Sequence, residues 1–434
     1  MKRRVIATFA VVALATVGAA CSNQRAAPSS SSTAPVPAVI DTATNSAPEP
    51  DGHGSDPSTT VGSPDTLPSG GYVTAITDVP VDSPAFDGFE RDITALMQQA
   101  GLPGASLLVV QHGQLVEQEA WMEYNLDTTV LIASGSKWLS AATIMTLVDD
   151  GTIELDMPIS TYVPELVGPN VRGITFRQLL SFTSGLADDD RIPCSGDLTY
   201  SLQGCAAEFI KAGVVHPPGA TFRYGGQHLL VAAAIAEIVT GVPFAELFQQ
   251  RIARPLGMTS TVFTEVGDPR SAAVDFPSPA GSARSTLGDY GRFLEMIYHE
   301  GVAPDGTRIL QAATIAEMQT NQIADAEYGT AAAFRVADES PYGLGEWLDW
   351  TREDGSALVV SSDGAFGFRP WLDKENDLFG VYLIQDIDSG YVEGDPNAAT
   401  DDGGTVHTSG NWIFEWVAEA LGGSLPKDKY PDRT

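Results

Sequence analysis

Basic residues are scarce in this 434-residue chain. Lysine and arginine together number 24 against 56 aspartate and glutamate residues, and the formal net charge is −32 at pH 7. A chain of that charge repels the phosphate backbone of nucleic acids, so the composition argues against nucleic acid as a partner. Hydrophobic residues make up 43% of the chain, which is enough to bury a large core in one domain or in two interleaved ones.

Several common catalytic designs are also missing. The chain has no Gly-x-Ser-x-Gly elbow, which argues against an α/β-hydrolase. Its six histidines include no His-x-His or His-Glu-x-x-His spacing, so the sequence supports neither a metal site nor, in our interpretation, any cofactor. No internal repeat and no apolar run of membrane-spanning length follows the N-terminal leader.

The leader itself, residues 1–21, has the features of a signal peptide. A basic start precedes an apolar run from Val5 to about Val17, and Gly18-Ala-Ala-Cys21 follows. A cysteine directly after small residues resembles a bacterial lipobox, in which that cysteine is lipidated. Because Gly18 stands where a lipobox usually has Leu or Val, cleavage without a lipid remains an alternative. We therefore expect a bacterial export product, which is either anchored through Cys21 to the outer face of the cytoplasmic membrane or secreted.

The only other cysteines are Cys194 and Cys205, which lie in a polar loop. An exported protein meets oxidising surroundings, so the pair predicts a disulfide, with two unpaired thiols as the alternative. Neither cysteine has the Cys or His neighbours of a zinc site.

The chain divides into segments of different composition. Residues 22–75 are rich in Ser, Thr, Pro, Ala and Gly, which predicts a flexible linker. Residues 76–425 have the composition of a folded domain, and residues 426–434 form a tail. In the domain, a helix over 86–99, a hairpin over 105–121 and β-rich segments from 342 to 385 flank a helical subdomain at about 151–335, before a last helix over 411–421. This order predicts an antiparallel sheet built from distant pieces of the chain.

The strongest chemical signal lies at the start of a run that is apolar nearly all round, as a buried helix is. Ser134 and Lys137 stand three residues apart there, so they share one helix face. Burial would lower the pKa of the lysine toward neutrality, and a neutral amine can accept the serine proton. The helix N-terminus also points backbone N–H groups toward an oxyanion.

The spacing alone leaves an alternative, in which Ser134 caps the helix and Lys137 extends to the surface. A second Ser-x-x-Lys match, Ser424 to Lys427, contains a proline in the C-terminal tail and cannot form such a helix.

The segments around this pair resemble the class C β-lactamase, penicillin-binding-protein and esterase superfamily over most of residues 80–420. The matching segments keep their order and approximate spacing: Ser134–Ala141, Asp149–Glu165, Ile174–Leu186, Pro217–Tyr224, Pro255–Thr259, Ser282–Asp289 and Asp305–Leu310. The resemblance implies an α/β fold of the α+β type, with a five-stranded antiparallel sheet flanked by helices. It also implies an all-α subdomain, with the active site between the two.

In that superfamily a Tyr-x-Asn motif supplies a general base or proton relay beside the lysine. Tyr224 fits this role by its context, with a structural aromatic as the alternative. The asparagine is missing, because the motif reads Tyr224-Gly225-Gly226. The contacts that it makes to the substrate amide or the lysine are therefore in question. His228, four residues later, would face the site if this segment is helical, or else is an ordinary helix residue.

The superfamily's third motif, Lys-Thr-Gly or His-x-Gly, lies on an edge strand. We place that strand at Val360–Asp373, with Ser362 where Lys or His would stand. Gly364 lets the backbone approach the substrate, and the N–H groups of Ser134 and Ala365 would bind the oxyanion. Ser362 and Phe366 are further candidate substrate contacts.

The missing cation at Ser362 matters for the substrate, because in the superfamily it helps to bind the carboxylate of β-lactams and D-alanyl peptides. Arg369 is a candidate replacement, with a surface or fold-supporting arginine as the alternative. Four aromatic residues around the strand would line an apolar acyl pocket or pack in the core: Tyr342, Trp347, Phe366 and Trp371.

Three hypotheses follow. The first is a serine hydrolase that is acylated at Ser134 by an ester or amide of a small molecule or cell-envelope component. The second is a catalytically weak envelope protein that retains the fold and binds a wall component or a partner. The third is true penicillin-binding or β-lactamase activity.

Overall fold

The computed structural model describes residues 74–77, 84–165, 168–187, 194, 199–264, 276–330, 340–386 and 413–423. The signal peptide, Cys21 and nearly all of the predicted linker lie outside the described residues. All described residues belong to one unit of the chain, Asp65–Thr434. Thr74 and Ala75, the last linker residues, already bind the domain: the hydroxyl of Thr74 and the N–H of Ala75 donate to the buried carboxylate of Glu295.

The main sheet has six antiparallel strands in the order β2-β1-β11-β10-β9-β8. They are β1 Gly104–Gln111, β2 Gln114–Met122, β8 Trp347–Thr351, β9 Ala357–Ser361, β10 Arg369–Asp373 and β11 Leu378–Leu383. Because β1 pairs with β11, two strands from the start of the domain join four from its end. The predicted fold class and the predicted antiparallel sheet are confirmed, with six strands in place of five in the part of the chain that the structure describes.

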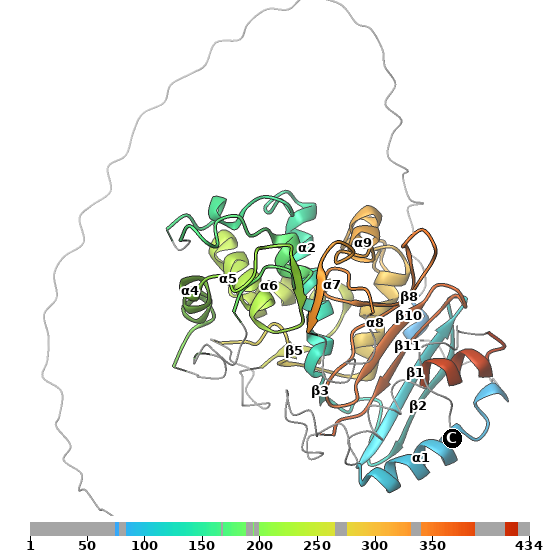
Figure 1. Ribbon diagram of the computed structural model, residues 1–434. Coiled ribbons are helices and arrows are strands. Elements are labelled where there is room, and N and C mark those ends of the chain that lie inside the picture. The colour runs from blue at the N-terminus through green and yellow to red at the C-terminus, as the bar shows by residue number, and fades with distance from the viewer. Residues whose placement is uncertain are drawn as a thin grey trace, which may run out of the picture. The chain divides into compact units, whose positions relative to one another are not determined.

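Helices cover both faces of this sheet (Figure 1). They are α1 Phe89–Ala100 and residues 413–420 on one face, and α8 Leu287–Tyr298 on the other. Helix α2, Ser136–Asp149, packs against α8 through Trp138 and Phe293. Side chains alternate along β1, so that Leu107 and Val109 pack with α1 while Leu108 and Val110 pack with α8. This two-sided burial explains why β1 is apolar along its whole length.

Short helices and strands make up the region between β2 and β8. The helices are α3 Phe176–Leu180, α4 Leu202–Ala212, α5 Gln227–Thr240, α6 Phe244–Phe248, α7 Arg254–Leu256 and α9 Ala312–Met318, with a π-helical turn at Gln249–Ala253. The strands are β3 Val130–Leu131, β4 Thr221–Arg223, β5 Val262–Phe263, β6 Ala283–Ser285 and β7 Glu327–Thr330. Within the described residues, no single helix has both the length and the hydropathy of a membrane span; the bent pair of α5 with the Phe244–Leu256 segment passes on length and composition only.

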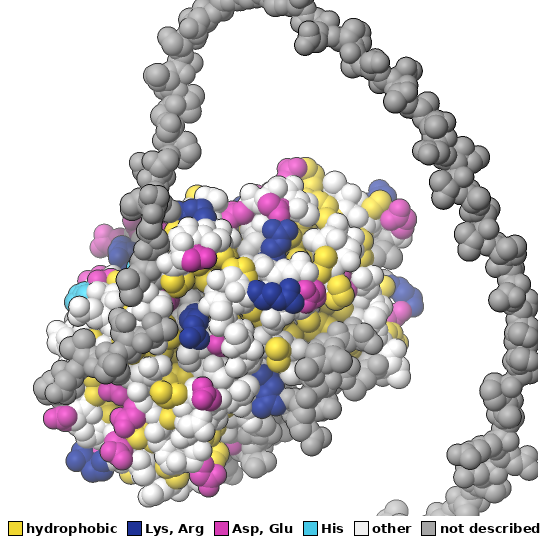
Figure 2. Space-filling model, turned by 180° about the vertical axis from the view of Figure 1, so that it is seen from behind, with side chains coloured by type: hydrophobic (Ala, Val, Ile, Leu, Met, Phe, Trp, Pro, Cys, Tyr) yellow, Lys and Arg dark blue, Asp and Glu magenta, His cyan; other side chains and the backbone are white. Residues whose placement is uncertain are grey.

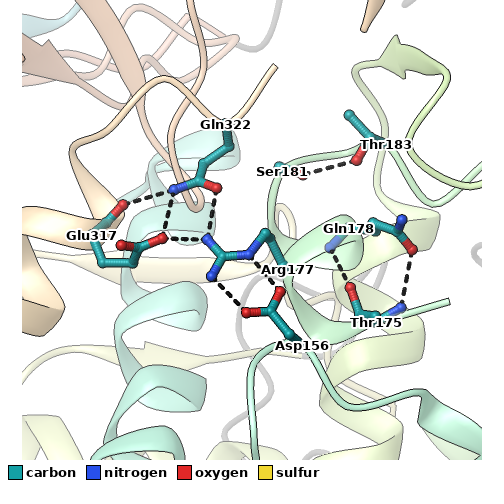
Figure 3. A network of polar contacts seen from close by, with 8 residues as sticks. All are labelled: Asp156, Thr175, Arg177, Gln178, Ser181, Thr183, Glu317 and Gln322. Atoms are coloured by element: carbon teal, nitrogen blue, oxygen red, sulfur yellow. Dashed lines mark hydrogen bonds and ion pairs between the residues drawn. The ribbon is translucent and has the colours of Figure 1, made fainter. Parts of the chain in front are cut away.

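Within this region, polar contacts join α3 to α9 (Figure 3). Arg177 of α3 binds Asp156 through two bonds of 2.6 and 2.9 Å and also contacts Glu317 and Gln322. Hydrogen bonding to this guanidinium lowers the pKa of the Asp156 and Glu317 carboxyls. The network therefore links α3 to α9.

The cysteine pair and the excess of acidic residues also have structural counterparts. Cys194 forms a disulfide with Cys205 of α4, as predicted, and both residues are buried. On the face shown in Figure 2, acidic side chains are interspersed with basic ones. Charge of one sign therefore does not cluster on this face.

Candidate active site

Ser134 lies in a 3-10 turn, Ala133–Gly135, that leads directly into α2. The apolar sequence after it forms a helix that is buried all round, so the turn is held between the sheet and the helical region. Ala133 has a φ of 43°, which is a strained conformation for a residue with a side chain. Gly135 is required because a Cβ there would lie 2.7 Å from the ring of Phe368. Ser134 itself is half-buried.

The structure brings Lys137 onto this serine. Its Nζ donates to Ser134 Oγ at 2.8 Å and to the carbonyl oxygen of Ala280 at 2.9 Å. The lysine is 5% exposed, so its side chain does not extend to the surface as a capping arrangement would require. Gly135, not Ser134, is the N-cap residue of α2. The pair therefore has the geometry of a nucleophile with an adjacent base.

Tyr224 follows β4 and completes a compact group with these two residues. Lys137 Nζ lies 4.7 Å from the centroid of its ring. The ring stacks on Trp347 at 5.1 Å and meets Phe182 edge-on at 5.4 Å. These contacts fix the plane of the phenol beside the lysine. Gly226 has no side chain to contact Lys137 and instead forms the N-cap of α5.

His228 is buried in the first turn of α5, behind Tyr224. Its Nε2 lies 2.9 Å from the carbonyl oxygen of Arg223, which can only accept, so this nitrogen carries the proton. Its Nδ1 then accepts from the hydroxyl of Ser184 at 2.7 Å. The imidazole is therefore placed to hold the residue before Tyr224, and both of its ring nitrogens take part in these two bonds.

The third motif lies in a turn, which corrects the predicted continuous strand from Val360 to Asp373. Strand β9 ends at Ser361 and β10 begins at Arg369. Between them the N–H of Gly364 donates to the Phe368 carbonyl at 2.8 Å. This turn brings Ser362 and Gly364 against the segment around Ser134.

Ser362 is buried at this turn, and its hydroxyl donates to the Ser134 carbonyl oxygen at 3.1 Å. Ser362, which stands where the superfamily has Lys or His, therefore supports the turn that carries Ser134. Gly364 packs so closely that a Cβ would clash with the Ile132 carbonyl oxygen. Ala365 and Phe366 follow, both half-buried. The backbone N–H groups of Ser134 and Ala365 remain the candidate oxyanion donors.

Other candidates belong to the core. Arg369 forms a buried ion pair with Asp363, and its guanidinium lies 5.0 Å from the ring of Phe414. It is therefore a fold-supporting arginine and does not replace the missing cation. Tyr342, Trp347 and Trp371 are each 1% exposed, so they pack in the core and do not line a pocket. Of the four aromatic candidates only Phe366 remains partly open.

Several groups that support the site have no direct signal in the sequence. Tyr290 of α8 is buried and donates to the Gly135 carbonyl at 2.8 Å, behind the nucleophile turn. Burial and the nearby charges of Glu346 and Asp363 raise the pKa of this phenol well above its usual value, so it stays a donor. The acidic residue Asp363, next to Gly364, was the one sequence feature that could have suggested the buried ion pair with Arg369. Across the described parts of the chain, no three His, Cys, Asp or Glu side chains are grouped as metal ligands.

An antiparallel sheet with Ser-x-x-Lys at the head of a buried helix defines the class of penicillin-recognising enzymes and their relatives. The Beta-lactamase family model matches residues 89–401, so the chain belongs to the beta-lactamase family. Penicillin-binding protein 4 of Amycolatopsis lactamdurans is 30% identical over 266 residues, which cover 53% of this chain and 68% of that protein.

Two further comparisons extend the range of relatives. The crystal structure of a candidate beta-lactamase from Bacteroides dorei DSM 17855 has a TM-score of 0.68 and 31% identity, covering 78% of this chain and 99% of that one. Lovastatin esterase of Penicillium rubens is 27% identical over 322 residues, covering 60% of this chain and 80% of that protein. The family therefore includes relatives named for esters as well as for penicillin.

Proposed function

We propose that this protein is an exported serine hydrolase that forms an acyl-enzyme on Ser134 and cleaves an ester, or an unusual amide, of a small molecule or cell-envelope component. The observation that carries the proposal is the 2.8 Å bond from Lys137 Nζ to Ser134 Oγ in a buried site. The disulfide between Cys194 and Cys205 supports export, because disulfides persist in oxidising surroundings. The signal peptide and the lipidation of Cys21 remain predictions of the sequence.

The chemistry follows from the placement of three side chains. Neutral Lys137 accepts the proton of Ser134 while Oγ forms a bond to the carbonyl carbon of the substrate. The N–H groups of Ser134 and Ala365 bind the resulting oxyanion. When the bond to the leaving alcohol breaks, Lys137 returns the proton to that alcohol, with Tyr224 as the relay between them. Water then attacks the acyl carbon and gives a proton to the same pair. This proton passes to Ser134 Oγ as the bond from Oγ to the acyl carbon breaks, which releases the acid and restores free Ser134.

Substrate preference is inferred from the third motif. The Ser362 hydroxyl donates to the Ser134 carbonyl, and Arg369 is paired with Asp363, so neither offers a positive charge to a substrate carboxylate. A site without that charge favours neutral acyl substrates over β-lactams, whose carboxylate needs a partner. The similarity to lovastatin esterase supports the ester preference.

The test compares wild type with Ser134→Ala, and with Ser160→Ala as the control, because Ser160 is also half-buried and lies in a 3-10 turn, Ile159–Thr161. We expect wild type and Ser160→Ala to hydrolyse p-nitrophenyl butyrate and to gain one fluorophosphonate adduct by intact mass, and Ser134→Ala to do neither. If wild type showed neither ester hydrolysis nor the adduct, the enzyme hypothesis would be contradicted, and the hypothesis of an envelope protein that binds a wall component or a partner would be favoured. Rapid acylation by fluorescent penicillin at Ser134 would instead indicate penicillin-binding activity, which the similarity to penicillin-binding protein 4 keeps as the second candidate.

A further inference from the structure

We propose that the buried ion pair between Asp363 and Arg369 positions the Ala365 N–H for oxyanion binding. Asp363 and Arg369 would thus be positioning residues that touch no substrate atom themselves. The inference rests on the proposed function, because it assigns a role within that same reaction.

The pair closes the turn that carries Ala365. Asp363 stands at the start of this turn, and Arg369 begins β10 at its end. Both side chains are 4% exposed. Two backbone bonds inside the turn, Gly364 to Phe368 at 2.8 Å and Gly367 to Gly364 at 2.9 Å, shape it from within. The ion pair joins the same two ends through side chains, so it restricts how far the turn can open.

The position of this turn determines the distance between the two oxyanion donors. The turn contacts the nucleophile segment at three points, through Ser362 Oγ on the Ser134 carbonyl, Gly364 against Ile132, and the Phe368 ring against Gly135. A displacement of the turn would therefore move the Ala365 N–H relative to the Ser134 N–H. Oxyanion stabilisation is lost steeply when a donor leaves hydrogen-bond range.

Stability alone does not explain a charged pair at this place. Replacing a buried ion pair by apolar groups of similar volume is often neutral or stabilising, because desolvation offsets the Coulomb attraction. A buried pair does provide direction, since each partner accepts few geometries. The ring of Phe414 beneath the guanidinium gives this arginine a fixed base on the helix at residues 413–420.

The test uses Asp363→Asn combined with Arg369→Met, a double variant that keeps approximate side-chain size and leaves no buried charge unpaired. Arg369→Lys, which keeps the charge and loses the planar fork, is the second variant. Arg251→Met is the matched control, because it removes the 2.8 Å ion pair to Asp150 at the opposite end of α2. Each protein is assayed for kcat and KM on p-nitrophenyl butyrate, for inhibition by phenylboronic acid, and for Tm.

In the double variant we expect kcat to fall by about 10- to 100-fold, less than or equal to the loss of a whole oxyanion donor, with KM changed less than threefold. The inhibition constant of phenylboronic acid, which forms a tetrahedral adduct on the serine, should rise by a similar factor. Arg369→Lys should lie between the double variant and wild type, and Arg251→Met should match wild type.

A folded double variant or Arg369→Lys with wild-type kcat and boronate affinity would overturn the proposal. So would a loss of activity that follows Tm alone and appears equally in Arg251→Met. These results are distinct from a failure of the proposed function, in which wild type itself shows no Ser134-dependent turnover or adduct; that outcome would contradict both.

Discussion

Glu346 offers a quantitative test of the structure away from the reacting atoms. It precedes β8, its side chain is 0% exposed, and neither carboxyl oxygen meets hydrogen-bond geometry with a described residue. Burial raises the pKa of this carboxyl to about 8, although the nearby Lys374 ammonium and Gln319 amide act in the opposite direction. The change that we consider is Glu346→Gln, which keeps the shape and cannot ionise.

The sign of the effect follows from proton binding. The folded protein keeps a proton on Glu346 at pH values where the unfolded chain, with a pKa of 4.5, has released it. Stability is therefore highest below pH 4.5 for this group and falls as the pH rises from 4.5 to about 8. At about 1.4 kcal/mol per pKa unit, the total loss from this one group is on the order of 5 kcal/mol.

The assay is urea unfolding of wild type and Glu346→Gln at intervals between pH 4.5 and 9. The free energy of unfolding of wild type should decline relative to the variant across this window, at up to about 1.4 kcal/mol per pH unit. Contributions from other carboxyls cancel in the difference. Glu90→Gln, on the exposed side of α1, serves as the control and should follow wild type. Parallel curves for wild type and Glu346→Gln would refute both the burial and the raised pKa of this residue.

Two other substitutions test the site. Ser362→Lys should slow hydrolysis of p-nitrophenyl butyrate, because it removes the hydrogen bond to the Ser134 carbonyl. It should also raise the rate of Ser134 acylation by fluorescent penicillin relative to the rate of ester hydrolysis. An unchanged ratio of the two rates would contradict our account of the substrate preference. His228→Phe should lower the free energy of unfolding by about 1–3 kcal/mol, because it leaves the Ser184 hydroxyl and the Arg223 carbonyl without this partner. It should also lower kcat/KM although Ser134 is intact. Wild-type values in urea unfolding and in ester assays would show that the imidazole does not hold Tyr224 in place.

Local patterns were sufficient for much of this protein. The apolar run that follows Ser134 predicts a buried helix, and the three-residue spacing brings Lys137 onto Ser134 where the 3-10 turn leads into α2. The hairpin around His112 and Gly113 was also predictable from the sequence, because a glycine-containing turn separates two β-rich segments. In the structure both turn residues have a positive φ. The ordered superfamily segments then identified the fold.

Only the tertiary structure decided which distant groups meet at the serine. The Ala280 carbonyl that binds Lys137 is 143 residues away, and Ser362 lies 228 residues from the carbonyl that accepts its hydrogen bond. No local propensity encodes such contacts, because they depend on how the whole sheet and its helices pack. For the same reason, neither the pairing of Arg369 with Asp363 nor the burial of Glu346 could be predicted from the sequence. The sequence therefore determined the pairing of Ser134 with Lys137, which we propose as nucleophile and base. Packing decided that Ser362 of the third motif supports the turn of Ser134 and that Arg369 is paired with Asp363.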